Sequence, residues 1–291
     1  MSRVKFGDVV KDVKINIDRL NNPYEYYVAG DHMDSEDLTI HRKGCFTTDD
    51  VGPAFIRVFK PGQILYGSRR TYLKKIAVAD FEGVCANTTF VFETKDPHAF
   101  EQRLLPFIML SKDFTTWSIA KSKGSTNPYV LFSDLADFEF ELPPLEEQKV
   151  LVDKLWAAYR LKEAYKKLLV ATDEMVKSQF IEMFGTVENN THNFPIMTIG
   201  EFANCFAGAT PSTSHPEYWE NGRIRWMSSG EVHKGHVEDT DFRITELGYK
   251  SASTRMVPIH SIVIAIAGQG KTRGTVAITE VDLCTNQSLC A

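Results

Sequence analysis

The chain has 291 residues and a formal net charge of -5 at pH 7, with 43% hydrophobic and 24% charged residues. These totals suit a globular protein of two domains and exclude a disordered, collagenous or disulfide-rich chain. No apolar run of about 18 residues occurs and the N-terminus lacks a secretory signal, so we expect no membrane contact and a cytoplasmic location.

Residues 1–142 form the first predicted domain, in which short β-rich runs dominate. Strands are predicted at 63–67, 76–79 and 89–93, because each run is bounded by Gly, Pro or Asn signals. A short helix is predicted at 100–112, with Pro106 limiting its regularity. The expected fold class is α+β, with a mixed α/β first domain.

Two polar loops of the first domain carry side chains suited to DNA. The densest basic cluster, with a serine and a tyrosine interleaved, consists of Ser68, Arg69, Arg70, Tyr72, Lys74 and Lys75. A second loop combines charge, hydroxyls and an amide in Lys121, Lys123, Ser125, Thr126 and Asn127. Lysines suit phosphates and arginines suit guanine, because only a guanidinium offers a two-pronged donor. The alternatives are a solvated basic turn for the first loop and a self-capped turn for the second.

A single long helix is predicted for residues 143–185. Apolar residues recur there near a 3.5-residue period, and Pro143, Pro144 and Gly185 suit its two ends. About 40 helical residues span roughly 60 Å, which indicates a spacer or a coiled-coil arm. The side chains expected to contact a second helix or a partner subunit are Leu151, Leu155, Tyr159, Tyr165, Leu169 and Val176.

Residues 186–291 repeat the order of features in the first domain. Val4–Val9 and Met197–Phe202 share the order apolar, polar, apolar, Gly, acid, apolar. Pro61 is matched with Pro258, and the strand predicted at 261–267 follows it. The third match pairs the run Cys85-Ala86-Asn87 with Cys284-Thr285-Asn286.

Recognition residues of the second domain are expected at Arg225 and in a loop with Gln269, Lys271, Thr272 and Arg273. The alternative for Arg225 and its neighbour Trp226 is a half-buried core position. The GQGKT run does not match a nucleotide-binding loop, in which four residues separate the first glycine from Gly-Lys. The five cysteines lie singly and the histidines lack ligand spacing, so neither a metal site nor a disulfide framework is predicted.

Several segments resemble landmarks of the specificity subunits of type I restriction-modification systems. The run from Glu141 to Gln148 (ELPPLEEQ) is similar to the entry into that family's spacer helix. Residues 122–128 with 133–135 resemble the segment that closes a target recognition domain, and residues 66–77 resemble its arginine-rich loop. Residues 209–212, 224–228, 274–277 and 286–287 resemble further landmarks in the second domain.

This resemblance implies two target recognition domains that each read half of a bipartite double-stranded DNA site. Two antiparallel helices would hold them apart and dock the modification subunits, which in turn bring the restriction subunit. S-adenosylmethionine, ATP and Mg would serve those partners, so no catalytic residue and no cofactor is expected in this chain. The acidic net charge does not exclude such a role, because local clusters decide DNA binding.

Against the family pattern, roughly a hundred residues are expected to be missing beyond Asn286, which would leave the second recognition domain incomplete. A shortened gene product, one half of a phase-variable locus and a clipped chain all fit this expectation. Two copies would then be able to pair their long helices and rebuild a symmetric two-domain reader. The remaining alternatives are an inactive or regulatory coiled-coil scaffold and a fragment of a fused nuclease or methyltransferase.

Overall fold

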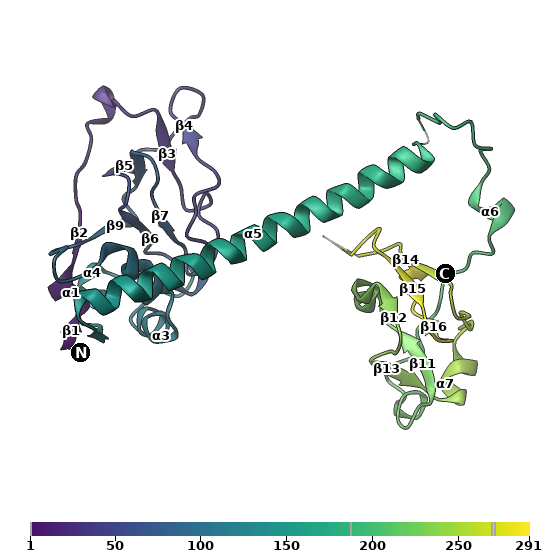
Figure 1. The fold of residues 1–291 in the computed structure, drawn as a ribbon. Coiled ribbons are helices and arrows are strands. Elements are labelled where there is room, and N and C mark those ends of the chain that lie inside the picture. The colour runs from purple at the N-terminus through teal and green to yellow at the C-terminus, as the bar shows by residue number, and fades with distance from the viewer. Residues whose placement is uncertain (1, 187, 269, 271) are drawn as a thin grey trace. The chain divides into compact units, whose positions relative to one another are not determined.

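A computed structural model describes residues 2–186, 188–268, 270 and 272–291 (Figure 1). Contacts divide the chain into two compact units, a first unit ending at Gln179 and a second unit spanning Phe180–Ala291. Each unit mixes strands with short helices, and one long helix follows the strands of the first unit, which confirms the predicted fold class. None of the described helices is both long and apolar enough to cross a membrane.

Two four-stranded sheets and a two-stranded ladder build the first unit. One sheet has the order β2-β9-β6-β7, formed by Val10–Asp12, Thr89–Thr94, Ile64–Gly67 and Ile76–Val78. The other has the order β4-β3-β8-β5, formed by Gly44–Cys45, Tyr26–Val28, Gly83–Ala86 and Phe55–Phe59. The antiparallel ladder joins β1 (Ser2–Lys5) to β10 (Glu139–Leu142).

Strand β6 contributes to two cores at once, because successive side chains of a strand point to opposite faces. Leu65 packs with Ala77 and Val91 in the cluster between the two sheets. Ile64 and Tyr66 belong to the larger cluster on the outer face. A continuous apolar run is typical of a strand buried on both faces, and it explains why this strand was predictable.

Short helices complete the outer core of the first unit. They are α1 (Phe6–Val9), η1 (Arg19–Asn21), η2 (Thr71–Leu73), η3 (Gln102–Leu104), α2 (Leu105–Leu110), α3 (Lys112–Ala120) and α4 (Phe132–Ala136). The helical stretch predicted at 100–112 is present as η3 and α2, and α3 begins where it was expected to end. Ser111 caps α3 by accepting a hydrogen bond from the Phe114 amide at 3.2 Å, so the chain forms two helices there. Pro106 lies in the first turn of α2, where no amide donor is needed.

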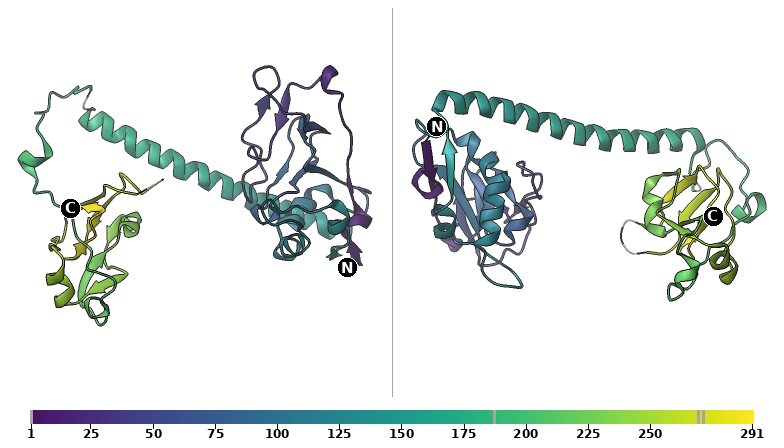
Figure 2. Two further views of the ribbon diagram at one scale, coloured as in Figure 1. Left: turned by 180° about the vertical axis from the view of Figure 1, so that it is seen from behind. Right: turned by 90° about the horizontal axis from the view of Figure 1, so that it is seen from below.

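The long helix α5 spans Leu145–Phe184 (Figures 1 and 2), which confirms the predicted element. Its first turns pack on the first unit, with Val152 fully buried. Gln148 is also fully buried: its Nε2 donates to the carbonyls of Ala99 and Pro143 at 2.9 and 2.8 Å, and its Oε1 accepts from the Glu101 amide at 2.8 Å. Gly185, with φ +73°, ends the helix by donating to the Ile181 carbonyl at 2.8 Å.

The second unit contains two further sheets and short helical turns. One sheet has the order β13-β11-β16, formed by Phe242–Ile244, Ile224–Met227 and Cys284–Thr285. The other has the order β12-β15-β14-β17, formed by His236–Val237, Val276–Thr279, Ile262–Ala265 and Leu289–Cys290. The helical elements are α6 (Ile199–Phe202), η4 (Pro216–Tyr218), η5 (Ser229–Lys234) and α7 (Glu246–Ser251).

Backbone hydrogen bonds show that the two units repeat one sheet register. Gly62 N donates to Ala79 O at 2.8 Å, and His260 N donates to Thr279 O at 2.6 Å. Gly62 and His260 both have positive φ, at 84° and 63°. Residue 62 therefore corresponds to residue 260, and the matching of Pro61 with Pro258 is one residue out of register.

The third match of the repeat is also displaced by one residue. Ser68 N donates to Thr88 O at 3.1 Å, and Ile266 N donates to Ser288 O at 2.9 Å. Thr88 thus corresponds to Ser288, so Asn87 aligns with Gln287 rather than with Asn286. The repeat itself is real, but the identical letters within it do not mark equivalent positions.

The outer sheet faces of the two units differ in exposure. Ile64, Tyr66 and Ile76 are 1%, 2% and 0% exposed. Their counterparts Ile262, Ile264 and Val276 are 50%, 37% and 47% exposed. An apolar groove of about 440 Å³ runs along this second face, lined by α6, β14 and the last two residues of the chain.

Candidate nucleic-acid interface

The two polar loops predicted in the first unit meet in the structure. Tyr129 forms β-bridges with both Arg69 and Lys123. Arg70 N donates to Pro128 O at 2.6 Å, and Thr71 Oγ1 lies 3.1 Å from Ser122 Oγ. Residues 69–75 and 121–129 therefore form one surface, which we call the paired-loop surface.

Two arginines and a tyrosine are exposed on the paired-loop surface. Arg69 and Arg70 are exposed, and neither guanidinium has an ion-pair partner among the residues that the structure describes. Tyr72 is 53% exposed in η2. Arg70 and Lys74, on either side of η2, have left-handed φ values of 50° and 47°. Such positions cost about 1–3 kcal/mol each and often mark functional loops.

The lysines of this surface have intramolecular partners. Lys74 is paired with Glu36, and Lys75 donates to the Gly30 carbonyl. Lys123 lies 2.9 Å from an Asp134 oxygen, and Lys121 lies 4.8 Å from the centre of the Trp117 ring. The side-chain hydrogen bond from Lys74 lowers the pKa of Glu36, and that from Lys123 lowers the pKa of Asp134.

The hydroxyl and amide residues of the two loops differ in accessibility. Ser68 is 6% exposed and its Oγ donates to the Thr88 carbonyl at 2.5 Å, so its predicted place on a DNA surface is wrong. Ser125, Thr126 and Asn127 are exposed. In the described part of the chain their side chains make no hydrogen bond, which disfavours the self-capped turn.

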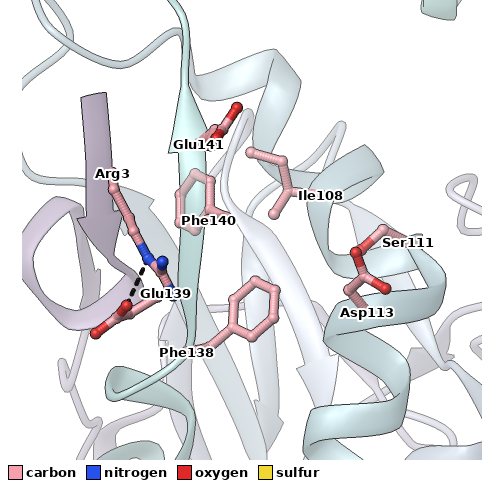
Figure 3. A pocket seen from close by; sticks show the side chains of 8 residues that line it. All are labelled: Arg3, Ile108, Ser111, Asp113, Phe138, Glu139, Phe140 and Glu141. Atoms are coloured by element: carbon pink, nitrogen blue, oxygen red, sulfur yellow. Dashed lines mark ion pairs between the residues drawn. The ribbon is translucent and has the colours of Figure 1, made fainter. Parts of the chain in front are cut away.

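A cleft elsewhere in the first unit is acidic, in contrast to the basic paired-loop surface (Figure 3). This cleft of about 460 Å³ lies beside β10, and its lining includes the carboxylates of Asp113, Glu139 and Glu141. Arg3 is its one lining cation, and the guanidinium contacts Glu139 at 2.7 Å. Three carboxylates against one arginine repel phosphate. The cleft therefore does not extend the paired-loop surface.

Comparison with known proteins identifies the family. A family model described as the type I restriction modification DNA specificity domain matches residues 16–169 and 192–291. The chain belongs to this family. The specificity subunit of the Escherichia coli type I restriction enzyme EcoR124I/EcoR124II is 36% identical over 69 residues, which are 24% of this chain and 17% of that subunit. The EcoDI specificity subunit of Escherichia coli is 28% identical over 142 residues, 47% of this chain and 31% of that subunit.

Solved structures of the specificity family share the fold. A chain from a study of complex assembly and conformational transition in the type I R-M system aligns at TM-score 0.59 and 21% identity, covering all of this chain and 74% of that one. The S subunit from M. genitalium aligns at TM-score 0.53 and 14% identity, covering 99% of this chain and 71% of that one. The matched segments of both curated E. coli relatives span less than a third of those subunits.

The helix-entry landmark of the specificity family has a structural explanation here. Buried Gln148 satisfies two carbonyls and one amide of the surrounding loops, so a side chain without an amide group would leave buried backbone groups unpaired. The sequence comparison noted this glutamine only as part of a motif. Its role is to fix the start of α5 on the first unit.

The predicted contact residues of α5 fall into two groups. Tyr165, Leu169 and Val176 are 58%, 68% and 61% exposed, and Leu151 is 41% exposed. Leu155 and Tyr159 instead pack in the core of the first unit, where Tyr159 is 8% exposed. The placement of these two residues at a partner surface is therefore wrong.

The predicted DNA residues of the second unit are less accessible. Arg225 lies 2.9 Å from an Asp239 oxygen, and Arg243 contacts the same carboxylate at 2.8 Å. Thr272 Oγ1 lies 3.3 Å from His233 Nε2, and Arg273 is exposed. Gln269 and Lys271 lie outside the described residues. DNA contact by this loop therefore stays a prediction.

A group with metal-compatible spacing lies beside α5. The ligand atoms of Asp37, His41 and Glu163 are within 4.8 Å of one another. However, Lys166 Nζ lies 3.3 Å from Asp37 and 2.8 Å from Glu163, so an ammonium group is already paired with both carboxylates. We assign no metal to this group.

Proposed function

We propose that the chain recognises DNA sequence as a specificity subunit of a type I restriction-modification complex. The observation that carries this proposal is the paired-loop surface, which brings Arg69, Arg70 and Tyr72 beside exposed Ser125–Asn127. Family membership supports the same role. In this proposal the protein acts in the cytoplasm, where the DNA is.

The charged residues of the paired-loop surface differ in whether they already have an acidic partner, and this suggests different roles for them. Arg69 and Arg70 have no acidic partner within the described chain, so they are available to bind guanine edges or phosphates. Lys74 and Lys123 first satisfy Glu36 and Asp134, which reduces their contribution to phosphate binding. We therefore assign base reading to the arginines and the 125–127 loop, and assign backbone positioning to the lysines.

The exposed side of α5 is the proposed docking surface for modification subunits, which would in turn bring the restriction subunit. Its exposed apolar side chains include Leu161, Tyr165, Leu168, Leu169 and Val176, each at least 57% exposed. A contiguous apolar stripe of this kind marks an interface. Methyl transfer and cleavage would belong to those partners, and this chain would supply recognition.

The proposal predicts a specific loss when the arginines are removed. In the complex with modification subunits, Arg69→Ala or Arg70→Ala should weaken binding to a selected site by about 1–3 kcal/mol if the arginine reads a base. An arginine that binds phosphate should instead lower the salt slope by about 1 and weaken all sequences equally. Binding would be measured by fluorescence anisotropy across a salt series.

Lys60→Ala is the matched control, because it removes one exposed positive charge at the other end of β6. Its affinity and salt slope should stay close to those of the unchanged protein. If both arginine variants behave like Lys60→Ala, the paired-loop surface does not bind DNA. A wild-type complex that binds selected and random DNA equally well contradicts the proposed function as a whole.

The exposed α5 stripe also supports a second candidate, in which two copies pair through this helix. Sedimentation of the chain alone and with modification subunits separates the two. A dimer that persists when modification subunits are added favours helix pairing between copies. A monomer in the assembled complex contradicts it.

A further inference from the structure

A short segment of the first unit, residues 36–38, forms hydrogen bonds to α5 well beyond the start of the helix. Tyr159 Oη donates to Asp37 Oδ1 at 2.6 Å and accepts from the Leu38 amide at 2.9 Å. Lys166 Nζ lies 3.3 Å from Asp37 Oδ2. Lys162 Nζ donates to the Glu36 carbonyl at 3.3 Å. Residues 36–38 thus contact three turns of the helix, and we call this contact the junction.

The junction is buried, and the proton of the hydrogen bond between Tyr159 and Asp37 stays on the tyrosine near neutral pH. Asp37 is 5% exposed. Burial alone would raise the pKa of Asp37, but hydrogen bonds from Tyr159 and the Thr39 amide, together with Lys166, lower it to about 2. Burial and the hydrogen bond to Asp37 raise the pKa of Tyr159 to about 12. Near neutral pH the phenol therefore always donates and the carboxylate always accepts.

The same segment also holds the paired-loop surface. Ser35 Oγ donates to the Leu73 carbonyl at 2.5 Å, and Glu36 N donates to the Lys74 carbonyl at 3.1 Å. Glu36 is also the carboxylate partner of Lys74. Residues 35–38 therefore contact both residues 73–74 of the paired-loop surface and α5.

Two separate attachments determine the direction of a rigid rod, whereas one attachment leaves a pivot. Gln148, Val152 and Trp156 attach the first turns of α5, and Tyr159 is the attachment furthest along this packed stretch, about 16 Å beyond Gln148 at 1.5 Å per residue. The end of α5 at Phe184 lies roughly 37 Å beyond Tyr159. A tilt of about 5° at the junction would move that end by roughly 3 Å, which is one base-pair step of DNA.

We propose that Asp37 and Tyr159 are positioning residues that hold the paired-loop surface at one angle on α5, and so set the spacing between DNA half-sites that the protein accepts. This inference rests on the proposed function. The junction itself touches no DNA. The junction would affect the spacing between the two DNA half-sites. The paired-loop surface would determine which bases are recognised.

The test compares spacer preference between variants of the full chain in complex with modification subunits. Sites bound by the wild-type complex are first selected from random DNA, and the spacer of the selected site is then lengthened or shortened by one base pair. Tyr159→Phe should reduce discrimination between these spacers about tenfold, because it removes one hydrogen bond to a charged group. The preferred half-site bases and the salt slope should not change.

One further variant and two controls allow the inference to be tested even if Tyr159→Phe does not fold. Lys166→Met removes a half-exposed ammonium and should reduce spacer discrimination in the same direction, by a smaller factor. Lys167→Met is the control, because Lys167 is exposed and its side chain makes no hydrogen bond or ion pair in the described part of the chain. Tyr24→Phe is the control for loss of a tyrosine hydroxyl, since that hydroxyl likewise has no hydrogen bond there.

Hydrogen exchange at the Leu38 and Thr39 amides reports the junction independently of DNA. Faster exchange in Tyr159→Phe and Lys166→Met, together with broadened spacer preference, supports the inference. Faster exchange with an unchanged spacer preference overturns it and leaves the proposed function intact. A wild-type complex that selects no site overturns the proposed function itself, and the inference with it.

Discussion

The two units share a sheet register but differ in what covers the outer face. In the first unit Tyr66 and Ile76 lie beneath α2, α3 and α4 in one large core. In the second unit their counterpart Ile264 lines the apolar groove beside α6, and Val276 is 47% exposed. The helices α1 and α6, which hold corresponding places in the two units, also differ in burial. Phe6 in α1 is fully buried, whereas Ile199 in α6 is 59% exposed.

In a sheet that is buried on both faces, strand register and stability usually depend on both faces, and the two units separate these contributions. The inner faces are equally well packed: Leu65 and Ala77 are fully buried in the first unit, and Val263 and Ala277 are 0% and 2% exposed in the second. Register in both units therefore follows the inner face and the backbone pairing. Within the residues described, the outer face is fully buried only in the first unit, so it should contribute more stability there.

The largest expected effect is on the stability of the outer faces. Ile76→Ala should destabilise the first unit by about 2–5 kcal/mol, because it leaves a cavity in a closed core. Val276→Ala, at the equivalent position, should cost less than about 1 kcal/mol, because the side chain is already 47% exposed. Hydrogen exchange resolved by strand would measure each unit separately.

The inner-face pair Ala77→Gly and Ala277→Gly is the control, and both changes should cost similar amounts. Equal losses from Ile76→Ala and Val276→Ala would mean that the second outer face is covered in solution. In that case the difference between the units lies in what binds the groove rather than in the chain.

A smaller effect distinguishes the acidic groups of the two units as pH falls. Asp37 and Asp239 both have their pKa lowered from 3.8 to about 2, but Asp37 is buried and Asp239 is exposed. A lowered carboxylate pKa stabilises the fold above the unfolded pKa, and this contribution is lost as pH falls through the folded pKa. Asp37 should therefore contribute about 2 kcal/mol at pH 5, most of which is lost by pH 2.

Denaturant unfolding of the first unit at pH 5 and pH 3, compared with Asp37→Asn, would measure this contribution. The variant should be less stable at pH 5 and should lose less stability on acidification. Parallel curves for the two proteins would show that Asp37 is not ionised in a protected site. Asp239→Asn should alter this pH dependence little, because solvent screens an exposed pair.

Local signals explain which parts of the structure were predictable. The period of α5, the prolines before it and Gly185 after it are all encoded within a few turns, so the helix was correct to within two residues at each end. The strands β6, β7 and β9 likewise show their apolar runs and flanking turns directly. Helix α3 was missed because its start depends on the cap at Ser111 rather than on a strong period.

Long-range partners explain what was not predictable. Tyr159 and Asp37 are 122 residues apart, and nothing in the helical period distinguishes Tyr159 from exposed Tyr165. The basic loop was identified from its charges, but Glu36, which neutralises Lys74, lies 38 residues away. Ser68 resembles a loop residue in sequence and is buried only because residues 88 and 130 pack against it.

The smallest expected effect concerns Arg225, where the units differ in how their arginines are held. Arg69 is free within the described chain, whereas Asp239 binds both Arg225 and Arg243. Asp239→Asn should release Arg225 and raise DNA affinity a few-fold at low salt, and the gain should vanish near 1 M salt, where charges are screened within about 3 Å. Glu246→Gln removes the same exposed charge from α7 without touching an arginine, so it separates release of Arg225 from the change in net charge. An equal gain in both variants, measured by anisotropy across a salt series, would show that Arg225 is remote from DNA and that recognition by this protein rests on the first unit.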